Sequence, residues 1–314
     1  MRNGFGQADW LESAVREWWR QFERSQAGHV ITEFAPAALL AARLADLPRA
    51  DLGTGFTVPP AVRPMASMQP WLKLRKDHLE AADRRLVEAV NPVIRRLGGR
   101  ALKWTADLFE GATRLCCSMP EFDHYTSRPE GHLGLVPPRR QPLTPVWPSG
   151  RRPRLFVYMD AHNQRLKGLL KALSQLGLNS LVCVPGWSRS GVVSQPVDLA
   201  RAARECDLAI THAGHGSTTA LLLAGKPVFL CPRSLEQAML GHRLNAQGLA
   251  HSLNFLEPEP DLPGRLEAWL GDEALGRSVR AFAEGRQNAG DALENIRQAL
   301  RWRPEPGPTP GGQA

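Results

Sequence analysis

The second half of the chain alternates short apolar runs with segments of helical periodicity. The apolar runs occupy residues 155–159, 180–184, 208–211 and 228–231, and their length suits buried strands. In the segments between them, apolar residues recur every three or four positions, as on one face of a helix. This alternation predicts an α/β domain in which crossover helices join the strands of a doubly wound parallel sheet.

The first half shows the same patterns over fewer elements. Aromatic and aliphatic residues recur at helical spacing over 9–27, and HVITEF (29–34) predicts a strand. A helix of small residues should then end near Ala45, and a second strand should lead to Gly53. A further strand is expected at 113–118. Together they form a β-α-β pattern, in which loops after the strands face a ligand crevice.

Proline marks the irregular segments of the first half. The loop TVPPAVRPMASMQP (57–70) has no strong structural pattern. We interpret it as a lid over a binding pocket, with a mobile insertion as the alternative. The helical pattern over 72–97 should break at Pro92, because proline lacks an N–H group and clashes with the preceding turn.

A stretch without periodicity separates the two halves. It reads GLVPPRRQPLTPVWPSGRRPR (134–154) and is rich in proline and arginine, as interdomain linkers often are. We therefore predict a partial first domain over 1–135, a linker over 136–153 and a second domain over 154–302. The tail at 303–314 is rich in proline and glycine and is expected to be disordered.

Composition and charge limit the cellular location and the partners that the protein can have. The 314 residues contain no apolar run long enough to span a bilayer, and the N-terminus lacks the apolar core of a signal peptide. We therefore expect a cytoplasmic protein. The five cysteines form no CxxC pair, so neither a zinc site nor a disulfide framework is indicated. The net charge of +8 could attract anionic ligands or an anionic membrane face, but no basic run with interleaved aromatics indicates nucleic acid.

A glycine-rich turn after the 208–211 strand supplies the clearest chemistry. Gly214 and Gly216 let the backbone approach an anion closely, and a helix should open at Ser217. N–H groups at a helix start point toward such an anion, and the helix dipole adds attraction. The side chains that could donate hydrogen bonds to it are those of His212, Ser217 and Thr218.

The order of residues after this turn resembles the signature of the UDP-glycosyltransferase superfamily, whose members have the GT-B fold. The family signature runs H-x-G-x-x-S, G-x-P, a proline and then D/E-Q. Matching residues stand at His212, Gly214, Ser217, Gly225, Pro227, Pro232, Glu236 and Gln237. The resemblance implies two Rossmann-type domains, of which the N-terminal one is incomplete here.

The resemblance also implies an activity. A hexose would pass with inversion from a UDP- or TDP-sugar donor to the hydroxyl of a small or lipid-like acceptor, without a metal or other cofactor. The residues that would hold the donor diphosphate are His212, Gly214, Gly216, Ser217 and Thr218. Glu236 and Gln237 would bind the donor sugar, whereas Ala220 stands where the family often has a ribose-binding glutamate.

The catalytic base is the missing part of the resemblance. The family histidine that activates the acceptor belongs to strands ahead of 29–34, and no residue here aligns with it. Asp123 and His124, which follow a strand, are candidates for a base and its orienting carboxylate. Glu33 and His162 also follow strands. An incomplete first sheet would leave an exposed edge strand, so self-association is a further expectation.

Three alternatives stay open at this level. A non-catalytic GT-B-fold protein or partner subunit could bind a nucleotide and lack the base. Sugar-nucleotide epimerisation would need several carboxylates around the sugar, and Glu236 alone is suitably placed. A serine hydrolase is disfavoured because the sequence around Ser217 (GHGST) is not the G-x-S-x-G elbow.

Overall fold

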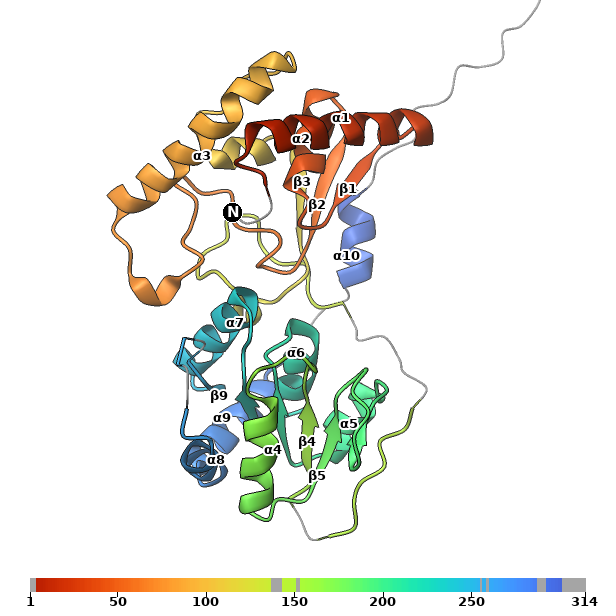
Figure 1. Ribbon diagram of the computed structural model, residues 1–314, viewed down its shortest axis with the longest axis vertical. Helices are drawn as coiled ribbons and strands as arrows, with labels where there is room; N and C mark the ends of the chain where they lie inside the picture. The colour runs from red at the N-terminus through yellow and green to blue at the C-terminus, as the bar shows by residue number, and fades with distance from the viewer. Residues whose placement is uncertain are drawn as a thin grey trace, which may run out of the picture.

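Two parallel β-sheets, each packed with helices, divide the molecule into two parts (Figure 1). The computed structural model describes residues 4–136, 143–150, 153–254, 256–257, 260–286 and 292–300. The predicted tail (303–314) and much of the predicted linker (137–142 and 151–152) lie outside the described residues. In the described part, no helix combines the length and the hydropathy that a membrane span requires.

The first part is built on a three-stranded parallel sheet of order β1-β2-β3. Its strands are β1 (Val30–Thr32), β2 (Arg49–Gly53) and β3 (Ala112–Cys116). Its helices are α1 (Ala8–Ser25), α2 (Pro36–Leu44), α3 (Lys76–Arg96) and the short 3-10 turns η1 (Pro70–Leu72), η2 (Thr105–Phe109) and η3 (Pro120–Phe122). Helices α1, α2 and α3 share one apolar core, which confirms the predicted helix and strand pattern.

Helix α3 runs through Pro92 without a break, so the predicted interruption is wrong. Proline removes one backbone N–H, but Val90, Val93 and Ile94 on either side are all buried in the same core. The side chain of Asn91 also exchanges two hydrogen bonds with the backbone of Leu102, at 2.8 and 2.9 Å. Packing on both sides of the proline therefore outweighs the lost helical hydrogen bond.

The second part contains a six-stranded parallel sheet of order β6-β5-β4-β7-β8-β9. The strands are β4 (Leu155–Tyr158), β5 (Ser180–Cys183), β6 (Val192–Val193), β7 (Leu208–Thr211), β8 (Val228–Leu230) and β9 (Ala250–Ser252). The sequence predicted β4, β5, β7 and β8, whereas β6 and β9 lack an apolar run long enough to predict them. Strand order reverses between β4 and β7, and ligands of such sheets bind outside the carboxyl ends at that point.

Helices of the second part follow the strands as the alternation predicted. They are α4 (Leu166–Gln175), α5 (Leu199–Glu205), α6 (His215–Leu223), α7 (Leu235–Ala246), α8 (Leu262–Leu270) and α9 (Glu273–Glu284). The last helix, α10 (Ala292–Ala299), was expected to finish the second domain but lies beside the first sheet (Figure 1). Asn295 in α10 donates a hydrogen bond of 2.8 Å to the carbonyl of Leu133. Periodicity identifies the apolar face of a helix but not the sheet that it covers.

The turn η3 joins the two parts. Phe122 is fully buried in the core of the second part, with its ring 5.6 Å from that of Phe282. Arg243 of α7 and Gln247, which follows that helix, donate hydrogen bonds of 2.8 and 2.9 Å to the carbonyls of Pro120 and Glu121. The segment after β3 is therefore held against α7 and α9 of the second part.

Candidate functional site

The glycine turn lies directly after β7, at the point where strand order reverses. Ala213 takes a left-handed backbone conformation (φ 62°), and α6 begins at His215, two residues before the predicted start. A Cβ on Gly214 would lie 3.0 Å from Nε2 of His212, so glycine permits this close packing. A Cβ on Gly216 would meet nothing within 4 Å. A ligand can therefore approach the backbone at Gly216, beside the unpaired N–H groups that begin any helix.

His212 adds a ring donor beside this turn. Its Nε2 faces Gly214, and its ring lies 5.9 Å from the ring of Tyr158. Burial lowers the pKa of His212, with the charges of Asp160 and Arg233 acting in opposite directions. A neutral ring retains one N–H group, and an anion at the turn can accept a hydrogen bond from it.

Ser217 and Thr218 do not behave alike. The Ser217 hydroxyl lies at the margin of the turn and donates to the carbonyl of Gly214 at 3.2 Å. Thr218 is fully buried, and its hydroxyl lies 3.3 Å from that of Thr211. Thr218 therefore offers no exposed surface to a diphosphate, unlike the expectation from the sequence. Successive side chains on a helix diverge by about 100°, so Thr218 faces the sheet while Ser217 faces the turn.

Glu236 and Gln237 occupy the first turn of α7. The hydroxyl of Ser234 caps this helix by accepting from the Gln237 N–H at 3.3 Å, and Oε1 of Gln237 accepts from the Arg233 N–H at 2.9 Å. Burial raises the pKa of Glu236, and the charge of Glu33 raises it further. Glu33 follows β1, so carboxylates of both parts approach each other near the start of α7.

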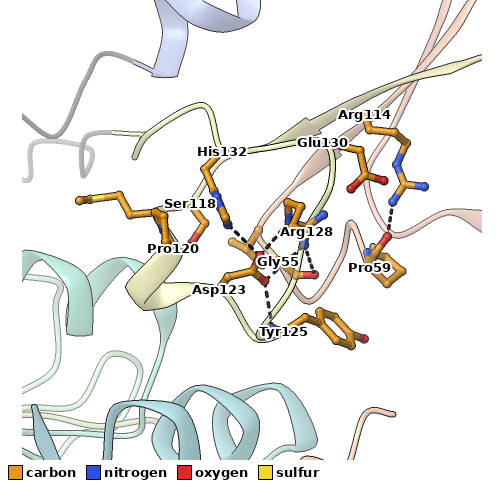
Figure 2. Close-up of polar contacts among 12 residues, drawn as sticks. Gly55, Pro59, Arg114, Ser118, Pro120, Asp123, Tyr125, Arg128, Glu130 and His132 are labelled. Atoms are coloured by element: carbon orange, nitrogen blue, oxygen red, sulfur yellow. Dashed lines mark hydrogen bonds and ion pairs between the residues drawn. The ribbon is translucent and has the colours of Figure 1, made fainter. Parts of the chain in front are cut away.

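Asp123 and His124 do not form the pair that sequence suggested. The Asp123 carboxylate accepts from Nε of Arg128 at 2.7 Å and from the Tyr125 N–H at 3.0 Å, and it lies 2.8 Å from Nε2 of His132 (Figure 2). Neither ring nitrogen of His124 has a partner. Neighbouring side chains on an extended backbone point in opposite directions, which separates the two groups.

Cys116, Asp123 and His132 bring three potential metal-ligand atoms within 4.8 Å of one another. Their chemistry does not suit a cation. The Arg128 guanidinium already neutralises Asp123, and both side chains of that ion pair are 1% exposed. Burial raises the pKa of Cys116 to about 12, which keeps the thiol protonated, whereas metals bind the thiolate. The cluster is therefore a buried structural ion pair.

His124 instead stacks on His215, a residue that sequence reasoning did not single out. The two rings are 6.0 Å apart with an interplanar angle of 19°, and the Phe56 ring meets His124 edge-on at 5.7 Å. Burial, with the charge of His215, lowers the pKa of His124 to about 3, and burial lowers that of His215 to about 4. His215 lies 3.0 Å from the Ser118 hydroxyl through Nε2. Two neutral imidazoles therefore connect the first part to the glycine turn.

His162 lies farther from this arrangement. Its side chain is 84% exposed and pairs with Asp160 at 3.2 Å. Exposure of this degree leaves its ring in water, unlike the buried rings of His124, His212 and His215. The structure therefore groups three histidines around the turn and leaves the fourth outside.

No family model and no curated protein matches the sequence. Solved structures do resemble it. The spinosyn rhamnosyltransferase SpnG has a TM-score of 0.67 at 17% identity, covering 95% of this chain and 80% of its own. The glycotransferase of kitacinnamycin reaches 0.67 at 16% identity, covering 95% of this chain and 84% of its own. The glycosyltransferase SnogD from Streptomyces nogalater reaches 0.59 at 17% identity, with 94% and 80% covered.

These similarities extend over both parts of the molecule, including both parallel sheets and the loops between them. Identities this low carry the backbone arrangement and not the roles of single residues. The arrangement agrees with the fold class that the signature from His212 to Gln237 indicated. The chain therefore has the GT-B fold of the glycosyltransferases.

Proposed function

We propose that this protein is a glycosyltransferase that moves a sugar from a nucleoside diphosphate donor to a hydroxyl of a small or lipid-like acceptor. The observation that carries the proposal is the open glycine turn at the strand-order reversal. Gly216 leaves space over the start of α6, and Nε2 of His212 faces Gly214 in the same turn. A diphosphate matches both features, because it accepts several hydrogen bonds and carries negative charge at a helix start.

The donor side of the reaction follows from these contacts. Backbone N–H groups at the start of α6 and the ring N–H of His212 would bind diphosphate oxygens. As the bond from the sugar to the phosphate breaks, negative charge grows on the leaving diphosphate, and the same donors stabilise it. These groups supply the charge stabilisation, so we propose that the transfer needs no metal ion.

Glu236 and Gln237 are proposed to hold the sugar. The half-buried carboxylate of Glu236 accepts hydrogen bonds from sugar hydroxyls, and the Gln237 amide can both donate and accept. Both residues begin α7, next to the gap between the two parts. Attack by the acceptor on the face opposite the diphosphate would invert the anomeric carbon.

Two structures similar to this one support the donor class. SpnG has been solved with thymidine diphosphate and also with the spinosyn aglycone, and VinC with dTDP. Their identities to this chain are 16 to 18%, so they support the kind of ligand and not its details. We propose a TDP- or UDP-sugar as the donor.

Calorimetric titration with thymidine diphosphate and with uridine diphosphate tests the donor site. At least one should bind, and His212→Ala should weaken that binding about tenfold or more, the effect of one hydrogen bond to a charged group. His251→Ala, which removes a histidine paired with Asp272 away from the turn, is the control and should bind normally. If neither nucleotide binds, the proposal is wrong.

A second function, nucleotide binding without catalysis, is favoured by one observation. His124 has no carboxylate partner, and its pKa of about 3 makes it a weak base. Release of nucleotide from a TDP- or UDP-sugar separates the two functions. Turnover that depends on an added hydroxyl compound supports transfer, whereas tight binding without release supports the non-catalytic reading.

A further inference from the structure

A pocket of about 320 Å³ lies between the two parts of the molecule. Three segments form its walls: the proline-rich loop after β2, the residues after η3, and the second half of α7. The lining residues that matter here are Ala66, Pro70, His124, His242, Arg243 and Ala246. We call this space the loop–α7 pocket.

The lining determines which charge the loop–α7 pocket can accept. Alanine, valine and proline side chains supply an apolar surface, and none of the described residues that line it is acidic. Arg243 is its one permanently charged side chain. Such a lining suits a neutral or anionic molecule and disfavours a cation, which would meet like charge without a carboxylate to offset it.

His124 offers the first polar group to a ligand. It is 3% exposed, and none of the described residues is hydrogen-bonded to either of its ring nitrogens. Buried polar groups in folded proteins usually have a hydrogen-bond partner, so an unpaired one indicates a place where a ligand group can bind. A neutral imidazole presents one N–H donor and one acceptor nitrogen, and a hydroxyl can bond to either.

Arg243 offers the second polar group. Its Nη2 donates to the carbonyl of Pro120 at 2.8 Å, which fixes the guanidinium against η3. Its Nε is buried, and no hydrogen bond joins it to another group in the described part of the chain. The N–H group on Nε can therefore bond to a carbonyl or carboxylate oxygen of a ligand without disturbing the contact with Pro120.

The position of the loop–α7 pocket connects it with the proposed donor site. The ring of His124 stacks on that of His215, the first residue of α6, at 6.0 Å. The opposite wall is the second half of α7, whereas Glu236 lies in the first turn of that helix. A molecule that reaches His124 from this pocket thus lies beside the ring that stacks on the start of α6.

We infer that the loop–α7 pocket holds the acceptor, and that this acceptor is a small neutral or anionic ring compound with a hydroxyl at His124 and a carbonyl or carboxylate at Arg243. The inference rests on the proposed function, because an acceptor presupposes a donor at the glycine turn. Small-molecule sites measure about 300–1,000 Å³, so this pocket is at the small end of that range. It fits one ring or a pair of fused rings and not a macrocycle.

Three naphthalene probes of one shape test the predicted charge preference. We expect 2-naphthol and 2-naphthoate to bind at least tenfold more tightly than 2-naphthylmethylammonium in calorimetric titrations. Arg243→Met should weaken 2-naphthoate about tenfold and 2-naphthol much less, since only the carboxylate gains a charged hydrogen bond. Equal binding of all three probes, or an unchanged affinity for 2-naphthoate in Arg243→Met, would overturn the inference.

A filled pocket tests the location. Ala246 is exposed on α7, so Ala246→Trp can occupy the pocket without disturbing the core, and it should weaken 2-naphthol at least tenfold. Ala281→Trp, at an exposed alanine of α9, is the matched control and should bind the probe normally. Thymidine diphosphate and uridine diphosphate are titrated in parallel. If a nucleotide binds but no naphthalene probe does, the inference fails and the proposed function stands; if neither nucleotide binds, the proposed function fails, whatever the probes do.

Discussion

Two loops that follow parallel strands use their polar groups in opposite ways. After β3, the Asp123 carboxylate is fully engaged by Arg128, His132 and the local backbone. After β7, Nε2 of His212 faces Gly214 and the space above Gly216 is open. The polar groups of the first loop bond to one another, whereas the second loop leaves hydrogen-bond donors for a ligand.

This difference indicates that the loop after β3 has a structural role, whereas the loop after β7 can bind a ligand. The ion pair of Asp123 and Arg128 holds the turn that carries His124 against the Gly55 loop, where a Cβ on Gly55 would come within 3.0 Å of the His124 backbone. His124 then points away from that ion pair, toward His215 and the gap between the parts. A perturbed, buried carboxylate near a cleft is therefore a positioning group here, and the neutral rings beside it face the ligand space.

Removing the Asp123 carboxylate should have the largest effect on stability. Asp123→Ala leaves the buried guanidinium of Arg128 without its partner, which should lower the free energy of unfolding by about 3–5 kcal/mol in urea denaturation. The double variant Asp123→Leu/Arg128→Met removes both charges and should recover part of the loss. A loss of unfolding free energy below about 1 kcal/mol would show that the ion pair does not stabilise the loop after β3.

Blocking the open turn should abolish nucleotide binding instead of folding. Gly216→Val places a side chain in the space above the start of α6, so thymidine diphosphate should bind at least 100-fold more weakly, a change of about 3 kcal/mol. Gly28→Val is the matched control, since a Cβ at Gly28 also meets nothing within 4 Å. Unaltered nucleotide affinity in Gly216→Val would remove the distinction between the two loops.

The stacked histidines predict acid sensitivity. Because the folded pKa values of His124 and His215 are about 3 and about 4, the unfolded chain binds protons first as pH falls below about 6.5. Asp51, whose pKa burial raises to about 6, works in the opposite direction, since its protonation on acidification favours the folded state. The net loss of stability between pH 6.5 and pH 5 should be about 2 kcal/mol.

Two variants divide that loss between its sources. His124→Phe should remove most of the fall in stability over this range, whereas Asp51→Asn should enlarge it. Urea titrations at each pH measure both effects. A stability that stays constant from pH 6.5 to pH 5 in the wild type would contradict the buried, neutral state of the two rings.

The smallest expected effect is that of metal removal. If the start of α6 and His212 stabilise the leaving diphosphate, nucleotide release from the donor should be the same with and without EDTA. Nucleotide release is the measure of sugar transfer, and a reaction with added Mg²⁺ is the control. Loss of turnover in EDTA that Mg²⁺ restores would mean that the glycine turn is not sufficient.

The sequence determined the second sheet and the glycine turn because their contacts are local. His212, Gly214 and Ser217 lie within one strand-turn-helix unit, so their spacing alone places them at one turn. The order from His212 to Gln237 also placed Glu236 at the start of the next helix. In such units, periodicity and turn residues fix the geometry before any distant contact forms.

Other features depended on how the two parts dock, and the tertiary structure alone decided them. Phe122 enters the core of the second part, His124 meets His215, and α10 returns to the first sheet. Thr218 turned inward, because the buried face of α6 is set by the sheet beneath it. Periodicity tells which residues of an element are apolar, but contacts between residues far apart in the chain depend on shape and charge across a surface that periodicity does not describe. Local sequence thus predicts the glycine turn, whereas the loop–α7 pocket depends on contacts between distant segments of the folded chain.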